Sequence, residues 1–135
     1  MGSLDERFGW SAMPLAMWPV GGALYAGFLA VTTLAMIENT HFEKTARIQA
    51  DREHKVIETG PYAVVRHPGY VGTILGFILT PPLLLGSWWA FLPAGGAALT
   101  LIARTALEDR MLRRELSGYE EYTRKVRFRL LPGIW

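Results

Sequence analysis

Two long stretches without charge constrain the fold more than any other feature of the sequence. Residues 11–37 contain no Asp, Glu, Lys or Arg over 27 positions, and residues 68–103 contain none over 36. A helix needs about 20 apolar residues to cross a hydrocarbon core about 30 Å thick. A chain of 135 residues is too short to bury both stretches in protein. The pattern therefore predicts membrane-spanning helices and argues against a soluble single domain.

The first stretch is long enough for one span, with an apolar core from Leu15 to Ile37. A secretory signal peptide fits poorly, because no basic segment precedes this core and the core is too long.

The second stretch is too long for one span. Pro81-Pro82 and Gly86-Ser87 interrupt it, and Trp88-Trp89 follows directly, as aromatic residues at a membrane interface often do. We expect a helical hairpin over residues 68–103, with its first arm bent at the proline pair. We expect Gly21-Gly22 and Gly95-Gly96 to let membrane helices approach closely.

These elements predict an all-α integral membrane protein with three transmembrane helices: one span, then the hairpin. Lys and Arg number one in residues 1–10, five in residues 38–67, none in the hairpin turn and eight from residue 104 onward. Positive charge favours the cytoplasmic side. We therefore expect a multi-pass protein whose middle segment and C-terminal helix face the cytosol.

We expect the chain to form a single unit. Residues 1–10 are predicted to be a loop, with Met1-Gly2-Ser3 resembling an artificial start, followed by the span over 11–37. Residues 38–67 form a cytoplasmic segment, 68–103 the hairpin, and 104–135 a cytoplasmic helix and tail. The helical pattern runs from Arg104 to Tyr122 and can end or bend at Ser117-Gly118.

The densest local motif lies at residues 60–70, where the chain returns to the apolar stretch. Pro68 suits the first position of a helix and would hold Arg66 and His67 at its entrance. A helix N-terminus there could receive an anionic group such as a carboxylate. A plain helix entry with interfacial anchors explains the motif equally well.

A second group lies where the last span leaves the membrane. Arg104 and Glu108 are four residues apart on one face, at a depth where ionisable groups are costly, and we interpret them as functional. Asp109, with the nearby arginines at positions 110, 113 and 114, is interpreted as part of an ordinary charged surface.

Several chemistries are disfavoured. The chain has no Cys, and His41, His54 and His67 lack the spacing of a zinc site, so we expect no metal. A nucleic-acid partner fits poorly with a chain this apolar. The partners we expect are a lipid bilayer and a lipid-like substrate.

An ordered series of motifs resembles the isoprenylcysteine carboxyl methyltransferase family. It runs from Asn39 to Pro132, about two-thirds of the chain. Its parts are His54-Lys55-Val56-Ile57, Gly60-Pro61-Tyr62, Arg66-His67-Pro68-Gly69-Tyr70, Arg104-x-x-x-Glu108, and a tail with Glu115, Tyr119, Tyr122 and Arg129-Leu130-Leu131-Pro132.

The resemblance implies an enzyme that uses S-adenosyl-L-methionine to methylate the C-terminal carboxylate of a prenylated cysteine at the cytoplasmic membrane face. It implies that Arg104 binds the substrate and that Arg104 and Glu108 are catalytic. The cofactor contacts it implies are Gln49, His54, Lys55, Val56, Ile57, Tyr62, His67, Pro68, Gly69, Tyr70 and Glu108. The alternatives are methylation of another lipid-like acceptor, such as a phospholipid amine or a phenol, and a non-catalytic membrane module.

The sequence departs from the family in the number of spans and at two positions, one of which is Gly69, where some relatives have a larger residue. Members have at least five spans, so we expect this chain to lack N-terminal spans of the full family. The family's pair of glutamates reads Glu108-Asp109 here. The physiological acceptor and the oligomeric state stay open.

Overall fold

The computed structural model describes residues 1–39 and 56–135, and in this part of the chain it is helical, without strands. The all-α prediction is confirmed for these residues. In chain order the elements are α1 (Gly2–Phe8), α2 (Met17–Glu38), the short 3-10 helix η2 (Gly60–Ala63), α3 (Pro68–Thr73), the π-helix η3 (Ile74–Leu79), α4 (Thr80–Leu84), α5 (Phe91–Glu115) and α6 (Tyr119–Lys125).

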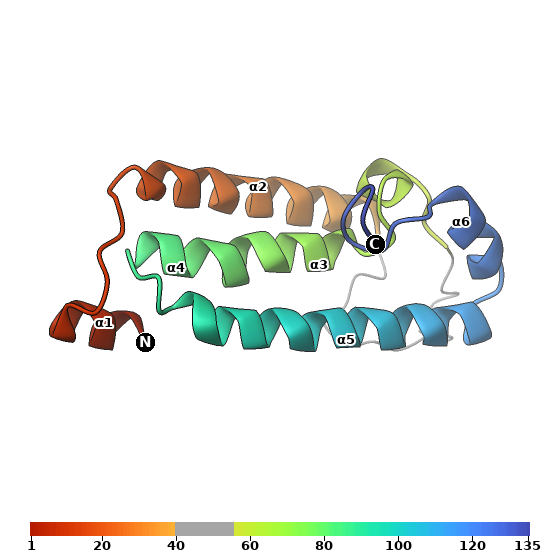
Figure 1. The fold of residues 1–135 in the computed structure, drawn as a ribbon. Helices are drawn as coiled ribbons and strands as arrows, with labels where there is room; N and C mark the ends of the chain where they lie inside the picture. Colours follow the sequence, from red (N-terminus) through yellow and green to blue (C-terminus); the bar gives the residue numbers. More distant parts are fainter. Residues whose placement is uncertain (40–55) are drawn as a thin grey trace.

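Three rods lie side by side in one layer (Figure 1). The outer rods are α2 and α5, and the middle rod is the continuous run α3–η3–α4. Helix α2 packs along the whole middle rod, and α5 packs against η3. The middle rod and α5 form the expected helical hairpin, which turns between residues 85 and 90.

The middle rod widens into a π-helix just before its two prolines. Pro81 and Pro82 have no backbone N–H, and their rings would clash with the carbonyls of Phe77 and Ile78, which lie four residues earlier in η3. A π-turn is one way to absorb such a clash without ending the helix. The predicted bend therefore takes the form of a π-helix on the N-terminal side of the proline pair.

Close helix packing depends on glycines of both the middle rod and α2. A Cβ at Gly76 would lie 2.7 Å from Cδ1 of Phe28 on α2. A Cβ at Gly21 would lie 3.0 Å from Cδ2 of Leu84, as the sequence led us to expect. The expectation for Gly22, Gly95 and Gly96 is wrong among the described residues, since a Cβ at any of these positions would meet nothing within 4 Å.

Residues 1–10 are not the loop that the sequence predicted, because Gly2–Phe8 form α1. Its Asp5 is buried and accepts hydrogen bonds from the Ser11 backbone N–H at 2.7 Å, from Ser11 Oγ at 2.6 Å and from Ser87 Oγ. These bonds hold α1 against the hairpin turn, which explains why the segment is ordered.

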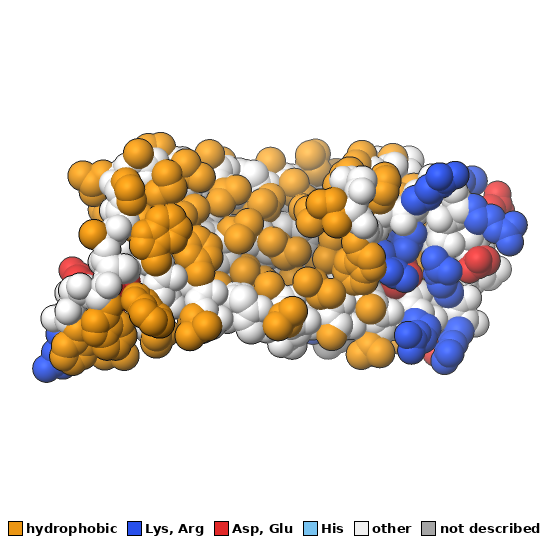
Figure 2. Space-filling model, viewed as in Figure 1, with side chains coloured by type: hydrophobic (Ala, Val, Ile, Leu, Met, Phe, Trp, Pro, Cys, Tyr) orange, Lys and Arg blue, Asp and Glu red, His pale blue; other side chains and the backbone are white. Residues whose placement is uncertain are grey.

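Among the described helices, α2 alone is long and apolar enough to cross a membrane by length and composition. It has 22 residues, and only 11% of its most apolar window is buried within the chain. The run Pro68–Leu84 is apolar but shorter. Figure 2 shows hydrophobic side chains over the body of the layer, with Lys and Arg gathered at the end that carries α6.

The C-terminal part follows the predicted outline. Helix α5 continues past Arg104 to Glu115, and α6 begins at Tyr119 after Gly118, whose φ of 82° is in the left-handed region. The break therefore falls at Ser117-Gly118, as expected.

Candidate active site

The site lies at the charged end of the layer, where the chain enters α3. Arg66 and His67 precede Pro68 and are both buried, with 5% and 6% of their surface exposed. Their backbone N–H groups bond to the carbonyls of Phe128 and Arg129 at 2.9 and 3.0 Å. The C-terminal segment therefore pairs with the helix entry and fixes where both side chains point.

Four residues that the sequence singled out come together here. The Tyr70 hydroxyl donates to Glu108 Oε2 and accepts from Arg104 Nε at 2.9 Å. The Arg104 guanidinium also lies over the Tyr70 ring, 5.7 Å from its centre. His67 stacks on Tyr70 with ring centres 5.8 Å apart, and its Nδ1 lies 3.8 Å from Glu108 Oε1. We call His67, Tyr70, Arg104 and Glu108 the entrance cluster.

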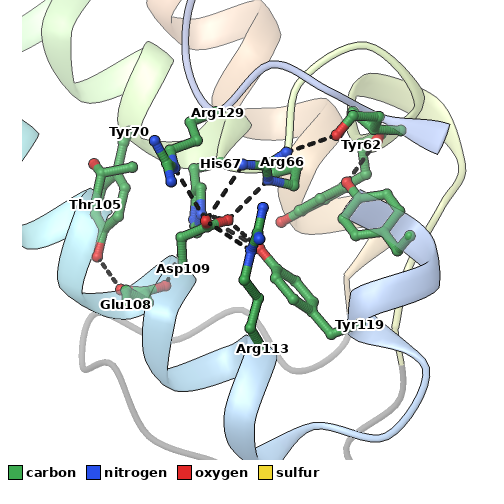
Figure 3. Close-up of polar contacts among 12 residues, drawn as sticks. Tyr62, Arg66, His67, Tyr70, Thr105, Glu108, Asp109, Arg113, Tyr119 and Arg129 are labelled. Carbon is green, nitrogen blue, oxygen red and sulfur yellow. Dashed lines mark hydrogen bonds and ion pairs between the residues drawn. The ribbon is translucent and has the colours of Figure 1, made fainter. Parts of the chain in front are cut away.

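Asp109 lies next to this cluster and connects it to three other segments (Figure 3). Its carboxylate is 1% exposed and accepts from Arg66 Nε at 2.8 Å, from Arg129 Nε at 3.0 Å and from the Tyr119 hydroxyl at 3.0 Å. Arg113 Nε lies 3.4 Å away. One carboxylate thus joins the helix entry, α5, α6 and the C-terminal segment.

These contacts decide the charge of Asp109. Burial by itself would raise the pKa of Asp109, but hydrogen bonds from His67, Arg129 and Arg66 outweigh it and hold the pKa well below its usual value. Burial raises the pKa of Tyr119, and the nearby Asp109 charge raises it further. Asp109 is therefore an anion and Tyr119 a neutral hydroxyl at physiological pH.

The interpretation of Asp109 as part of an ordinary charged surface is wrong. Asp109 lies one turn after Thr105, and both side chains are buried on the same face of α5. The signal available in the sequence was the spacing of these two polar residues on a face that points inward. Arg66, Arg129 and Tyr119 are brought to it by tertiary contacts that have no local pattern.

The other predicted cofactor residues are distributed around the cluster. Tyr62 is buried, and its hydroxyl accepts from Asn39 Nδ2 at 3.1 Å. Val56 packs against the buried side chains of Tyr119 and Tyr122. Ile57 is half-buried, Pro68 is buried and Gly69 is half-buried at the start of α3; Gln49, His54 and Lys55 lie outside the described residues.

The helix entry offers fewer backbone donors than the sequence suggested. Pro68 has no N–H, and the N–H groups of Tyr70 and Val71 bond to the His67 carbonyl at 3.0 and 3.3 Å. These three positions therefore offer few backbone N–H donors to a bound carboxylate. In the described part of the chain, no group of three or more His, Asp or Glu side chains could hold a metal ion.

Comparison with known proteins agrees with the motifs at this site. The model of the isoprenylcysteine carboxyl methyltransferase (ICMT) family matches residues 23–114, which include the whole entrance cluster and Asp109. Two rice proteins, from Oryza sativa subsp. indica and subsp. japonica, each carry the name "Probable protein-S-isoprenylcysteine O-methyltransferase" and are each 33% identical over 92 residues. The alignment covers 63% of this chain and 45% of each rice protein. The chain belongs to the isoprenylcysteine carboxyl methyltransferase family.

Proposed function

We propose that this chain carries out S-adenosyl-L-methionine-dependent methylation of the C-terminal carboxylate of a prenylated cysteine, or of a similar lipid-like carboxylate. The observation that carries the proposal is the meeting of His67, Tyr70, Arg104 and Glu108 at the polar end of an apolar helical layer. All four fall within the residues that match the family.

The side chains of the entrance cluster fit the cofactor. S-adenosyl-L-methionine supplies an electrophilic methyl group on a positively charged sulfur and carries an ammonium group. Glu108 offers a carboxylate that is only 19% exposed, and the stacked rings of His67 and Tyr70 border it. Anionic and aromatic groups are the partners that such cations prefer. Glu108, His67 and Tyr70 are therefore the residues proposed to hold this part of the cofactor.

Arg104 is proposed to hold the substrate carboxylate. An α-carboxylate has a pKa near 3.5, so it is already the nucleophile at neutral pH and needs no general base. The new bond joins a carboxylate oxygen to the methyl carbon, while the bond from that carbon to sulfur breaks and sulfur keeps the electron pair. A guanidinium can orient a carboxylate through two parallel hydrogen bonds, and Arg104 is already anchored to Tyr70.

We propose that the layer spans the membrane three times with the site at the cytoplasmic face. The hairpin lies beside α2 in one layer, with its first arm between α2 and α5, and the excess of Lys and Arg lies at the site end. A prenyl group would then reach the site from lipid, and the cofactor from the cytosol.

Calorimetric titration of the detergent-purified chain with S-adenosylhomocysteine tests the enzyme proposal. Binding by folded protein is the expected result, and no binding would refute the proposal for this chain. Turnover is then measured with an N-acetylated S-prenylated cysteine as acceptor.

Substitution of Arg104 separates the substrate role from the cofactor role. Arg104→Ala should abolish methylation while S-adenosylhomocysteine affinity stays within about threefold, since the lost contact is with the acceptor. Arg110→Ala, on an exposed position of the same helix, is the matched control and should retain activity. Equal loss of methylation and cofactor affinity in Arg104→Ala would contradict the assignment.

A further inference from the structure

The imidazole of His67 is held from both edges. Its Nε2 lies 3.5 Å from Asp109 Oδ1 and 3.5 Å from the Tyr119 hydroxyl oxygen. Its Nδ1 lies on the other edge, 3.8 Å from Glu108 Oε1. Stacking on Tyr70 and burial to 6% exposure prevent the ring from turning freely.

Both groups at the Nε2 edge can act toward the ring only as hydrogen-bond acceptors. A carboxylate has no proton to donate. The Tyr119 hydroxyl donates its proton to Asp109 Oδ1 at 3.0 Å, so it presents a lone pair to the ring. An unprotonated Nε2 would face two acceptors, which is unfavourable in a buried site.

The contacts of Asp109 fix both its position and its negative charge. Arg66 holds it from the helix entry, Arg129 from the C-terminal segment and Arg113 from its own helix. These three guanidinium groups oppose its negative charge, so the charge that acts on His67 is partly neutralised. The carboxylate then acts on His67 mainly as a directed hydrogen-bond acceptor.

We propose that Asp109 and Tyr119 are positioning residues that keep neutral His67 in the form protonated at Nε2, so that Nδ1 presents its lone pair toward Glu108. Nδ1 and Glu108 Oε1 then form a pair of acceptors 3.8 Å apart. Two acceptors cannot bond to each other, but both can accept from one N–H donor such as an ammonium group. The pair therefore selects the amino group of an amino-acid ligand and not its carboxylate.

This inference rests on the proposed function only for the identity of the ligand, which would be the amino-acid part of the cofactor. The protonation of the ring is a property of the chain alone. The two parts can therefore fail separately.

The ring state is measured by nitrogen NMR of the detergent-solubilised chain with 15N-labelled histidine at pH 8. His67→Gln identifies the His67 signals by their loss. The expected spectrum shows a protonated Nε2 and an unprotonated Nδ1. A ring protonated at Nδ1, or at both nitrogens, would overturn the inference, and neither result depends on a variant of Asp109 that has to fold.

The ligand preference is measured by calorimetry with S-adenosylhomocysteine and with two analogues, one without the amino group and one without the carboxyl group. A charged hydrogen bond is worth about 1.5–3 kcal/mol, so loss of the amino group should weaken binding by roughly 10- to 100-fold. Loss of the carboxyl group should weaken it less. Equal losses, or a larger loss without the carboxyl group, would overturn the subsite.

Substitution of Asp109 links the two measurements. In Asp109→Asn the amide can donate to Nε2, so the ring should shift toward protonation at Nδ1 and the affinity for S-adenosylhomocysteine should fall at least tenfold. Asp109→Glu should restore the Nε2 proton. Asp5→Asn, at a buried aspartate outside the site, is the control and should change neither. If S-adenosylhomocysteine does not bind the native chain, the proposed function fails, while the NMR result still decides the ring state.

Discussion

At the scale of single residues, the ionised side chain of Asp109 does the most to connect the site. It contacts guanidinium groups from three segments and is 1% exposed. Removing one partner of a buried ion pair is costly because the remaining charges lose their compensation. The stability of this end of the molecule therefore depends on one side chain.

We predict that Asp109→Asn lowers the free energy of unfolding by about 3–5 kcal/mol, the cost typical of breaking a buried pair. Thermal unfolding in detergent, followed by near-ultraviolet circular dichroism, measures it. Arg110→Gln changes an exposed charge on the next residue and should stay within about 0.5 kcal/mol. A loss below about 1 kcal/mol in Asp109→Asn would show that the arginines are well solvated without it.

The lowered pKa of Asp109 predicts a dependence on acid. Its pKa is lower in the folded chain than the value of about 3.9 expected when unfolded. Between the pKa of Asp109 in the folded chain and its pKa in the unfolded chain, the unfolded chain therefore binds more protons. The stabilisation by ionised Asp109 is complete above about pH 4 and is lost as the pH falls through the folded pKa. Denaturant titrations from pH 7 to pH 2 should show the native chain losing more stability than Asp109→Asn. Parallel curves would contradict this.

At the scale of elements, the middle rod is shaped by residues with small or restricted side chains. Gly76 allows the Phe28 ring of α2 to lie directly on the backbone, and the proline pair displaces the helix into a π-turn. The sequence showed the proline pair, but the partner of each glycine depends on which helices meet.

We predict that Gly76→Ala destabilises the chain by about 1–3 kcal/mol, because a new methyl group must displace the Phe28 ring. Gly95→Ala on α5 is the matched control, since its Cβ would meet nothing within 4 Å. Alanine is the better helix former there, so the control should be neutral or stabilised by up to about 1 kcal/mol. Chemical unfolding of both variants in the same detergent provides the comparison, and equal stability would rule out tight packing of α2 on the middle rod.

At the scale of the whole molecule, an apolar layer ends in a polar site. The arginine-rich end carries α6 and the entrance cluster, while α1 lies at the other end beside the hairpin turn (Figures 1 and 2). This polarity is what the proposed topology requires.

Single cysteines can test the topology because the native chain has none. We predict that Ser117→Cys, near the site, reacts with a membrane-impermeant maleimide only in inverted membrane vesicles. Ser3→Cys, in α1, should react only in vesicles of the native orientation. Both residues are exposed, and labelling from the same side would contradict an odd number of crossings.

Charge patterning in the sequence was sufficient for the coarse architecture. The charge-free stretches predicted helices, Pro81-Pro82 and Gly86-Ser87 predicted a hairpin, and the break at Ser117-Gly118 was visible as a turn signal. The same reasoning failed for residues 1–10, because the order of α1 comes from Asp5 bonding to Ser11 and to Ser87, a residue distant in the chain.

The sequence by itself predicted the all-helical character of the described residues, the hairpin and the four residues that meet in the entrance cluster, because hydrophobic patterning and motif spacing are local properties. Only the tertiary structure decided that Asp109 is buried and central. Arg66, Tyr119 and Arg129 approach it from three separate segments. Whether a carboxylate is a solvated surface charge or an internal link depends on which segments fold over it, and burial together with paired charge fixes its role.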